Sequence, residues 1–100
     1  MLTIKQGDTR NAIHATILKD GVAVNLTGSS ITIHISGIDI QGLCSYLDAV
    51  NGEIFYPLEK SVTDVAGLYT YEFVVKYPDG REETFPNDDY LRLHIMKEVT

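Results

Sequence analysis

At 100 residues the chain is long enough for one hydrophobic core and too short for two independently folded domains. Hydrophobic residues make up 44% and charged residues 22% of it, which excludes a disordered or fibrous chain. A net charge of -6 argues against nucleic acid or an anionic membrane as the partner, because both attract basic surfaces.

Alternation of apolar and polar residues with a period of two predicts β-strands along the first half of the chain. One strand is predicted over residues 2–6 and a second over 13–17, and the sequence at 19–21 predicts a hairpin turn after it. Isoleucines at alternate positions of residues 31–35 predict a further strand, because β-branched residues suit a half-buried sheet. The next segment, residues 37–42, is predicted to be a loop.

The second half of the chain continues this pattern and contains the most apolar strand. A weak strand over residues 43–50 is predicted to enter a type I′ turn at 51–52, since Asn-Gly accepts positive φ angles. Residues 54–58 form the return strand, and the polar residues 59–66 are predicted to cross between two sheets. Large apolar side chains at every second position of residues 69–77 predict the central strand of the core.

Two more turns separate the last predicted strands. The Pro-Asp-Gly sequence at residues 78–80 predicts a turn because proline fixes φ and glycine tolerates the left-handed region. A strand follows over 81–85, residues 86–88 turn again, and a strand over 91–95 closes the domain. Seven to eight short strands without a convincing helix are typical of an all-β sandwich or a small barrel.

The segment that ends at Tyr69 favours the sandwich. In immunoglobulin-like sandwiches a tyrosine near the start of one strand bonds back to the preceding corner. Asp64, Ala66 and Gly67 precede Tyr69 at the spacing of that corner. The sequence therefore predicts an immunoglobulin-like antiparallel β-sandwich in a single domain over residues 1–100, with Asp64, Gly67 and Tyr69 as its structural corner.

Patterns that mark common catalytic sites do not occur in the chain. There is no phosphate-binding loop, serine nucleophile elbow or zinc-binding pair. Cys44 is the only cysteine, which fits a reducing compartment, and it is predicted to be a half-buried strand residue rather than a nucleophile. No apolar run reaches the length of a membrane span, and the N-terminal residues lack a secretory signal. We therefore expect a protein without enzymatic activity, cofactor or metal.

Two groups of side chains keep other chemistry open. His14, His34 and His94 lie on predicted outward faces and would bind a metal only if their strands were neighbours, so solvated histidines are the favoured interpretation. Acidic residues at two hairpin ends would suit calcium or the acid–base pair of a glycosidase, although acids in turns are usually solvated. These acidic residues are Asp79, Glu82, Glu83, Asp88 and Asp89.

Exposed aromatic side chains are the main candidates for a contact surface. Tyr69, Tyr71 and Tyr77 share the apolar face of their strand and are predicted to belong to the core. Other residues fall out of register with the core face of their neighbours. The predicted partner-binding residues are Tyr46, Phe55, Tyr90, His34 and Met96.

Four segments carry a family resemblance. They are the Lys-x-Gly-Asp-Thr element at residues 5–9, the Asp-Gly to Leu-Thr-Gly run at 20–28, the corner at 64–69, and YPDGRxxTFPND at 77–88. In this order they resemble the N-terminal domain of the phage baseplate upper protein family, found in tails of phages and prophages of Gram-positive bacteria. The resemblance covers nearly the whole chain.

The resemblance implies a structural module of the phage tail tip or baseplate. Such a module docks onto other tail proteins and helps to present the host receptor-binding apparatus, without nucleic acid or membrane partners. It resides in the virion tail, is made and assembled in the bacterial host cytoplasm, and is compatible with a homo-oligomer in the assembled tail. The chain is expected to be either a short family member or the N-terminal domain of a longer tail protein.

Two alternatives remain beside this interpretation. A carbohydrate-binding sandwich would contact host-wall polysaccharide through Tyr46, Phe55 or Tyr90, because aromatic rings stack on sugars. An adhesion-type repeat of a surface protein would have the same fold, and the missing secretion signal disfavours it.

Overall fold

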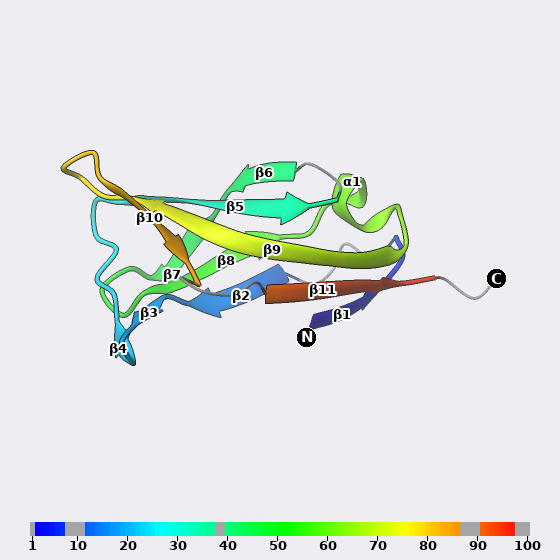
Figure 1. The fold of residues 1–100 in the computed structure, drawn as a ribbon, viewed down its shortest axis with the longest axis horizontal. Coiled ribbons are helices and arrows are strands. Elements are labelled where there is room, and N and C mark those ends of the chain that lie inside the picture. Colours follow the sequence, from blue (N-terminus) through cyan, green and yellow to red (C-terminus); the bar gives the residue numbers. More distant parts are fainter. Residues whose placement is uncertain (1, 8–11, 38–39, 87–90, 98–100) are drawn as a thin grey trace.

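The computed structural model describes residues 2–7, 12–37, 40–86 and 91–97, and these form an all-β sandwich (Figure 1). The all-β sandwich predicted from the periodicity is thus confirmed. The described residues contain eleven strands and one helical turn, where seven to eight strands and no helix were predicted. The elements are β1 (Leu2–Lys5), β2 (Ala12–Thr16), β3 (Leu18–Lys19), β4 (Val22–Ala23), β5 (Ser30–Ser36), β6 (Ile40–Leu43), β7 (Ser45–Asp48), β8 (Glu53–Pro57), α1 (Lys60–Thr63), β9 (Gly67–Lys76), β10 (Glu82–Phe85) and β11 (Leu91–Met96).

Two sheets enclose the core. The larger sheet has the strand order β1-β11-β9-β5-β6, with β10 also pairing with β9. The smaller sheet has the order β2-β8-β7, and the β3–β4 hairpin is a separate two-stranded ribbon. Strands β1 and β11 pair in parallel, whereas an antiparallel sandwich was predicted. Alternation along one strand shows which face a residue occupies, but not the direction of the neighbouring strand.

Strand β9 is the centre of the larger sheet, as its apolar pattern predicted. It pairs with β5, β10 and β11 and runs along much of the molecule in Figure 1. Tyr69, Tyr71, Phe73 and Val75 point inward and are buried, and Tyr77 packs half-buried against the same core. Burying a large apolar side chain contributes about 1.5–3 kcal/mol, so this face of β9 supplies much of the stabilisation of the sandwich.

The chain passes from the larger to the smaller sheet at Cys44. Strand β6 pairs with β5 in the larger sheet, and β7 pairs with β8 in the smaller one. Between them, Cys44 is buried and its N–H donates to the carbonyl of Ile31 at 2.8 Å. The residue therefore lies in the core between two strands, and the prediction of a half-buried residue within one strand is wrong.

The loop predicted over residues 37–42 is also wrong for its described part. Residues 40–43 form β6, which pairs with β5 from Thr32↔Leu43 to Ile35↔Ile40. Gly42 lies where a Cβ atom would overlap the ring of Tyr56 from the opposite sheet. Glycine disfavours a strand locally, so the local sequence offers little reason to expect β6 here. In the structure, the absence of a side chain at Gly42 allows the Tyr56 ring to lie against the backbone of β6.

Two turns show how the surroundings decide turn type. The hairpin predicted at residues 19–21 is present, and its two turn residues, Asp20 and Gly21, have positive φ angles of 53° and 79°. The type I′ turn predicted at Asn51–Gly52 is wrong, because only Gly52 has a positive φ there. Asp48 instead accepts hydrogen bonds from the backbone and side-chain amides of Asn51, and the connection between β7 and β8 takes four residues.

The segment from β8 to β9 crosses between the sheets, as predicted for residues 59–66. It contains the short helical turn α1, in which the N–H groups of Val62 and Thr63 donate to the carbonyl of Glu59. Val62 and Thr63 are fully buried, so this crossing closes one end of the core. In Figure 1, α1 lies at the end of the sandwich opposite the β3–β4 hairpin.

Candidate functional site

The predicted corner segment contains a hydrogen bond from the side chain of Tyr69 to the backbone. The Oη atom of Tyr69 donates a hydrogen bond of 2.7 Å to the carbonyl of Val65, four residues earlier. Gly37 and Gly67 flank the Tyr69 ring, and a Cβ at Gly37 would lie 2.9 Å from its Cδ1 atom. Asp64 is exposed, and its carbonyl accepts a hydrogen bond from Gln6 Nε2. In immunoglobulin-like sandwiches a corner tyrosine also bonds back to the backbone a few residues upstream.

Replacing Tyr69 by phenylalanine should lower the free energy of unfolding by about 1 kcal/mol, because it removes one hydroxyl hydrogen bond and keeps the ring. Urea denaturation of the two proteins measures the difference. Binding of partner proteins should be unchanged. Loss of binding with an unchanged melting temperature would instead make this corner part of an interface.

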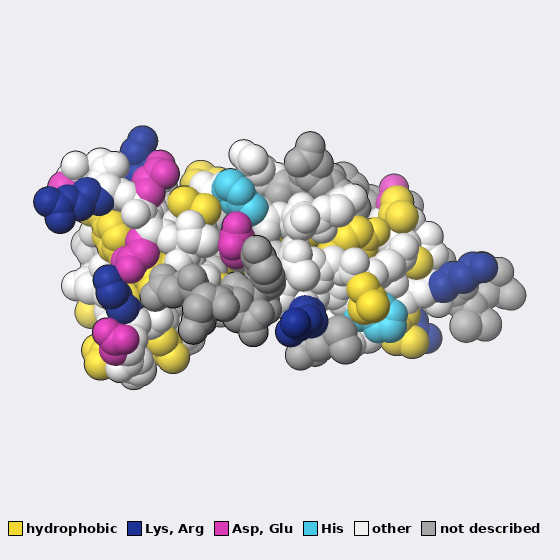
Figure 2. Space-filling model, in the orientation of Figure 1, with side chains coloured by type: hydrophobic (Ala, Val, Ile, Leu, Met, Phe, Trp, Pro, Cys, Tyr) yellow, Lys and Arg dark blue, Asp and Glu magenta, His cyan; other side chains and the backbone are white. Residues whose placement is uncertain are grey.

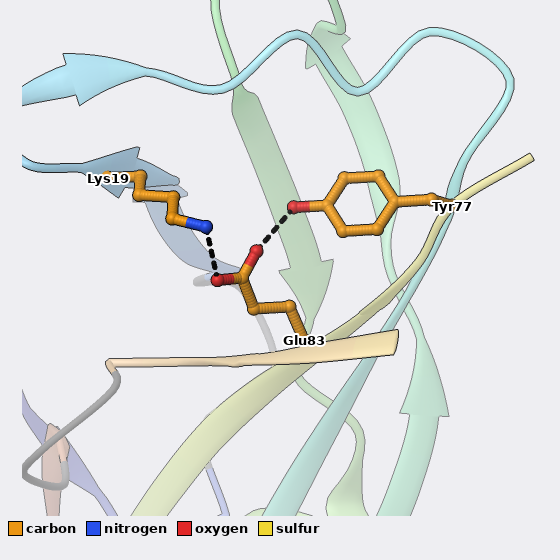
Figure 3. A network of polar contacts seen from close by, with 3 residues as sticks. All are labelled: Lys19, Tyr77 and Glu83. Atoms are coloured by element: carbon orange, nitrogen blue, oxygen red, sulfur yellow. Dashed lines mark hydrogen bonds and ion pairs between the residues drawn. The ribbon is translucent and has the colours of Figure 1, made fainter. Parts of the chain in front are cut away.

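A polar bridge joins the β3–β4 hairpin to β9 and β10 (Figure 3). Lys19 Nζ lies 2.8 Å from Glu83 Oε2, and Tyr77 Oη donates a hydrogen bond of 2.9 Å to Glu83 Oε1. These contacts lower the pKa of Glu83 from its ordinary value of 4.5, with the Lys19 hydrogen bond as the largest cause. Burial and the bond to Glu83 raise the pKa of Tyr77 to about 12. We call these three residues the polar bridge.

The polar bridge should make stability depend on pH in the acidic range. Because the pKa of Glu83 is lower in the folded than in the unfolded chain, its contribution is present above pH 4.5 and is lost as the pH falls through the folded pKa. The Glu83→Gln protein lacks this titration. The melting temperatures of the two proteins should therefore differ at about pH 7 and converge towards about pH 3.

A control for this prediction is available in the same region. Asp79 and Arg81 form an exposed pair at 3.6 Å, and such pairs contribute little. Asp79→Asn should therefore change the melting temperature less than Glu83→Gln at neutral pH. A Glu83→Gln difference that is constant from about pH 7 to about pH 3 would contradict the role of the polar bridge.

The predicted partner-binding residues do not form one surface. Tyr46 lies on β7 of the smaller sheet and is 41% exposed, whereas Phe55 is half-buried on β8 and stacks on His14 at a centroid distance of 6.1 Å. His34 on β5 is half-buried, and Met96 on β11 is 41% exposed, both in the larger sheet. Tyr90 lies outside the described residues.

Tyr46 and Phe55 also project from opposite faces of the smaller sheet. Tyr46 lies opposite Ile54, which points into the core, whereas Phe55 lies opposite Ser45 and His14 on the outer face. Neighbouring positions of a strand point to opposite faces, so these two rings do not share a flat platform. A saccharide stacking on both at once is therefore not supported by their placement.

The structure separates the predicted metal candidates. His14 belongs to the smaller sheet, and His34 and His94 belong to the larger one. Among the described residues, no group of three or more His, Cys, Asp or Glu side chains lies close enough together to hold a metal ion. Asp79 accepts a hydrogen bond from the backbone N–H of Arg81, and Glu83 belongs to the polar bridge. Asp88 and Asp89 lie outside the described residues.

Exposed aliphatic residues are the feature that the sequence analysis missed. Leu43 is 71% exposed, Leu47 56% and Leu68 72%, which exceeds the exposure of every predicted contact residue in the described chain. Figure 2 shows hydrophobic side chains in small separate groups on the face that carries β9. Alternation along β9 could have indicated that Leu68 is exposed, because it lies next to the core residue Tyr69. Alternation could not have indicated the exposure of Leu47, which lies at a β-bulge.

A groove of about 450 Å³ lies between the β2–β3 segment and the strands around β9, with Ile17, Phe73 and Phe85 in its wall. Its lining also includes Pro86 and Leu91, which border residues 87–90 outside the described chain. The thiol of Cys44 does not open onto this groove, and burial raises its pKa to about 11, so it stays protonated at neutral pH. Neither feature supplies a reactive site.

Comparison with known proteins assigns the family. The family model for the BppU N-terminal domain, the N-terminal domain of the baseplate upper protein, matches residues 1–86. The chain belongs to the BppU N-terminal domain family. Membership confirms the resemblance found in the sequence, and it gives the protein a structural role in the phage tail and baseplate, in association with other tail proteins.

Solved structures support the fold assignment of this BppU N-terminal domain. The N-terminal domain of phage TP901-1 ORF48 is similar with a TM-score of 0.69 at 19% identity, covering 99% of this chain and 85% of that one. CopC from Methylosinus trichosporium OB3b is similar with a TM-score of 0.56 at 15% identity, covering 100% of this chain and 89% of that one. These likenesses show the fold alone. No curated protein matches the sequence significantly.

Among the helices of the described residues, none has the length and apolar character needed to cross a bilayer.

Proposed function

We propose that this BppU N-terminal domain is a non-enzymatic docking module, which binds other proteins of the phage tail tip or baseplate and helps to present the host receptor-binding apparatus. The observation that carries the proposal is the family match over residues 1–86. A sandwich cross-braced by the corner and by the polar bridge suits such a role, because a rigid surface loses little conformational entropy when it binds.

Several finer points belong to the same proposal. The domain is a single immunoglobulin-like unit, for which the Tyr69–Val65 bond is the supporting observation. Assembly takes place in the bacterial host cytoplasm, and repeated copies in the tail bring the same docking surface to each position, as in symmetric assemblies. Tyr46 on the smaller sheet, and His34 and Met96 on the larger sheet, remain candidate contact residues.

Binding to purified tail proteins tests the proposal directly. The 100-residue chain is mixed with each baseplate and tail-tip protein of the same phage and analysed by size-exclusion chromatography with light scattering. We expect a complex with one of them. Absence of any complex at protein concentrations up to about 100 µM would overturn the docking function, because specific interfaces are tighter than this.

The carbohydrate alternative has its own readout. Host-wall polysaccharide is titrated into the chain while Tyr46 and Phe55 are each replaced by alanine. Saturable binding that depends on either ring, together with no binding to tail proteins, would favour the alternative over the docking module.

A further inference from the structure

The side of the sandwich where the chain changes sheets has two open strand edges. β6 is the last strand of the larger sheet and β7 is the last strand of the smaller one, and only Cys44 separates them in sequence. In the described chain β6 pairs with β5 alone and β7 with β8 alone. We call residues 40–48 the β6–β7 edge. An edge strand leaves a row of backbone donors and acceptors that can pair with another strand.

Three large apolar side chains on this edge are exposed. Leu43 is 71% exposed, Tyr46 41% and Leu47 56%. Residues 40–48 contain neither lysine nor proline, the residues with which proteins commonly protect an open edge. A bulge between Tyr46 and Asp48 interrupts pairing only at the end of β7. The remaining part, β6 and the start of β7, is therefore open to an added strand.

The charge around the edge selects the partner. Residues 20–59 contain five acidic residues and no Lys or Arg, although they make up the whole β4–β8 part of the molecule. Asp48 and Glu53 lie opposite each other across the β7–β8 ladder, and neither belongs to an ion pair found among the described residues. Like charges placed opposite each other in a sheet repel, so a cation beside them would be favourable.

We propose that the β6–β7 edge docks an extended strand of another tail protein, and that this strand carries apolar side chains on alternate positions and at least one Lys or Arg. The apolar side chains would cover Leu43, Tyr46 and Leu47, and the basic one would lie beside Asp48 and Glu53. A second copy of this chain is the less suitable occupant, because it would bring two acidic edges together. This inference rests on the proposed docking function and names its surface.

Two pairs of variants test the inference on the complex found in the binding experiment. Leu43→Lys with Leu47→Lys places lysines on the edge, and Val22→Lys with Leu68→Lys adds the same charge at two other exposed positions, one in β4 and one in β9. Glu53→Lys reverses the local charge, and Glu82→Lys is its control on β10. The edge variants should weaken binding by at least about tenfold and the controls by less than about twofold.

Amide hydrogen exchange provides a readout that side-chain contacts alone would not change. Pairing with an added strand should slow exchange of backbone amides within residues 40–48 when the partner binds. Circular dichroism and melting temperatures of all variants confirm that each is folded before binding is compared.

The results separate this inference from the function on which it rests. Slowed exchange at the edge and selective weakening by the edge variants support it. If a complex forms but amide exchange in residues 40–48 is unchanged, the β6–β7 edge is not the docking surface, although the docking function stands. The same conclusion follows if the edge variants bind as well as the control variants. Concentration-dependent protection of the edge without any partner overturns the choice of a basic tail protein in favour of a second copy. No complex at all overturns both.

Discussion

Replacing Phe73 by alanine is expected to lower the free energy of unfolding by about 3–5 kcal/mol, the range found for truncating large aromatic residues in cores. Stabilities of small domains are typically about 5–15 kcal/mol, so this loss is a large fraction of the total stability. Urea denaturation followed by circular dichroism measures the change. The size of the effect follows from the place of Phe73 in the larger sheet.

Phe73 lies where three strands of that sheet meet. Along the ladders it faces Ile33 of β5 on one side and Phe85 of β10 on the other, and all three are nearly inaccessible to solvent. Its ring also makes an edge-to-face contact with Tyr71 at 5.9 Å. Truncation removes the packing partner of all three neighbours at once, and close-packed surroundings relax only partly into the space.

The adjacent residue supplies the control. Val74 is on the same strand but points to the outer face and is half-buried. Val74→Ala should cost less than about 1 kcal/mol, since fewer contacts are lost, and Phe73→Leu should fall between the two alanine variants. Equal losses for Phe73→Ala and Val74→Ala would show that β9 does not pack as the structure describes.

Replacing Gly52 by alanine should cost roughly 2–4 kcal/mol, from two effects that add. Gly52 has a φ of +70°, which an L-residue adopts only with strain. A Cβ atom at this position would also lie 2.8 Å from the backbone carbonyl oxygens of both Ile17 and Val24. Backbone atoms cannot rotate away as a flexible side chain can, so the β7–β8 turn or the neighbouring segment has to move.

Another turn separates the two effects. Gly80 has a similar φ of +88°, but nothing lies within 4 Å of a Cβ built there. Gly80→Ala should therefore cost only the conformational strain, about 1–2 kcal/mol. Chemical denaturation of both variants gives the comparison. If Gly80→Ala were as destabilising as Gly52→Ala, the close contact with Ile17 and Val24 would not be the cause.

Hydrogen bonds around Gly52 explain why the type I′ turn predicted at Asn51–Gly52 does not form. Asn51–Gly52 is a strong signal for a two-residue hairpin when the turn stands alone. Here the carbonyl of Gly52 accepts a hydrogen bond from the N–H of Ile17, and the carbonyl of Ala49 accepts one from Leu26. These bonds to other segments hold the wider four-residue connection, and neither is visible in the local sequence.

The exposure of the candidate contact residues also depends partly on local sequence and partly on contacts between distant segments. Tyr46 and Met96 were predicted to be exposed, and each is 41% exposed. Alternation explains Met96, which follows the buried Ile95, but not Tyr46, which lies opposite the core residue Ile54. Leu43 and Leu47 were missed, although both are more exposed. Leu43 is exposed because β6 is the last strand of its sheet, and Leu47 is exposed because it lies at a bulge. The position of β6 and the bulge in β7 both depend on which strands are neighbours.

The all-β class, the central place of residues 69–77, the turn at Asp20–Gly21 and the bond made by Tyr69 could all be predicted from the sequence, because each depends on side-chain alternation or on residues a few positions apart. Four features could not be predicted in this way: the parallel pairing of β1 with β11, the strand β6 within the predicted 37–42 loop, the change of sheet at Cys44 and the polar bridge. These depend on contacts between segments far apart in the chain, and a period of two is equally compatible with many such pairings.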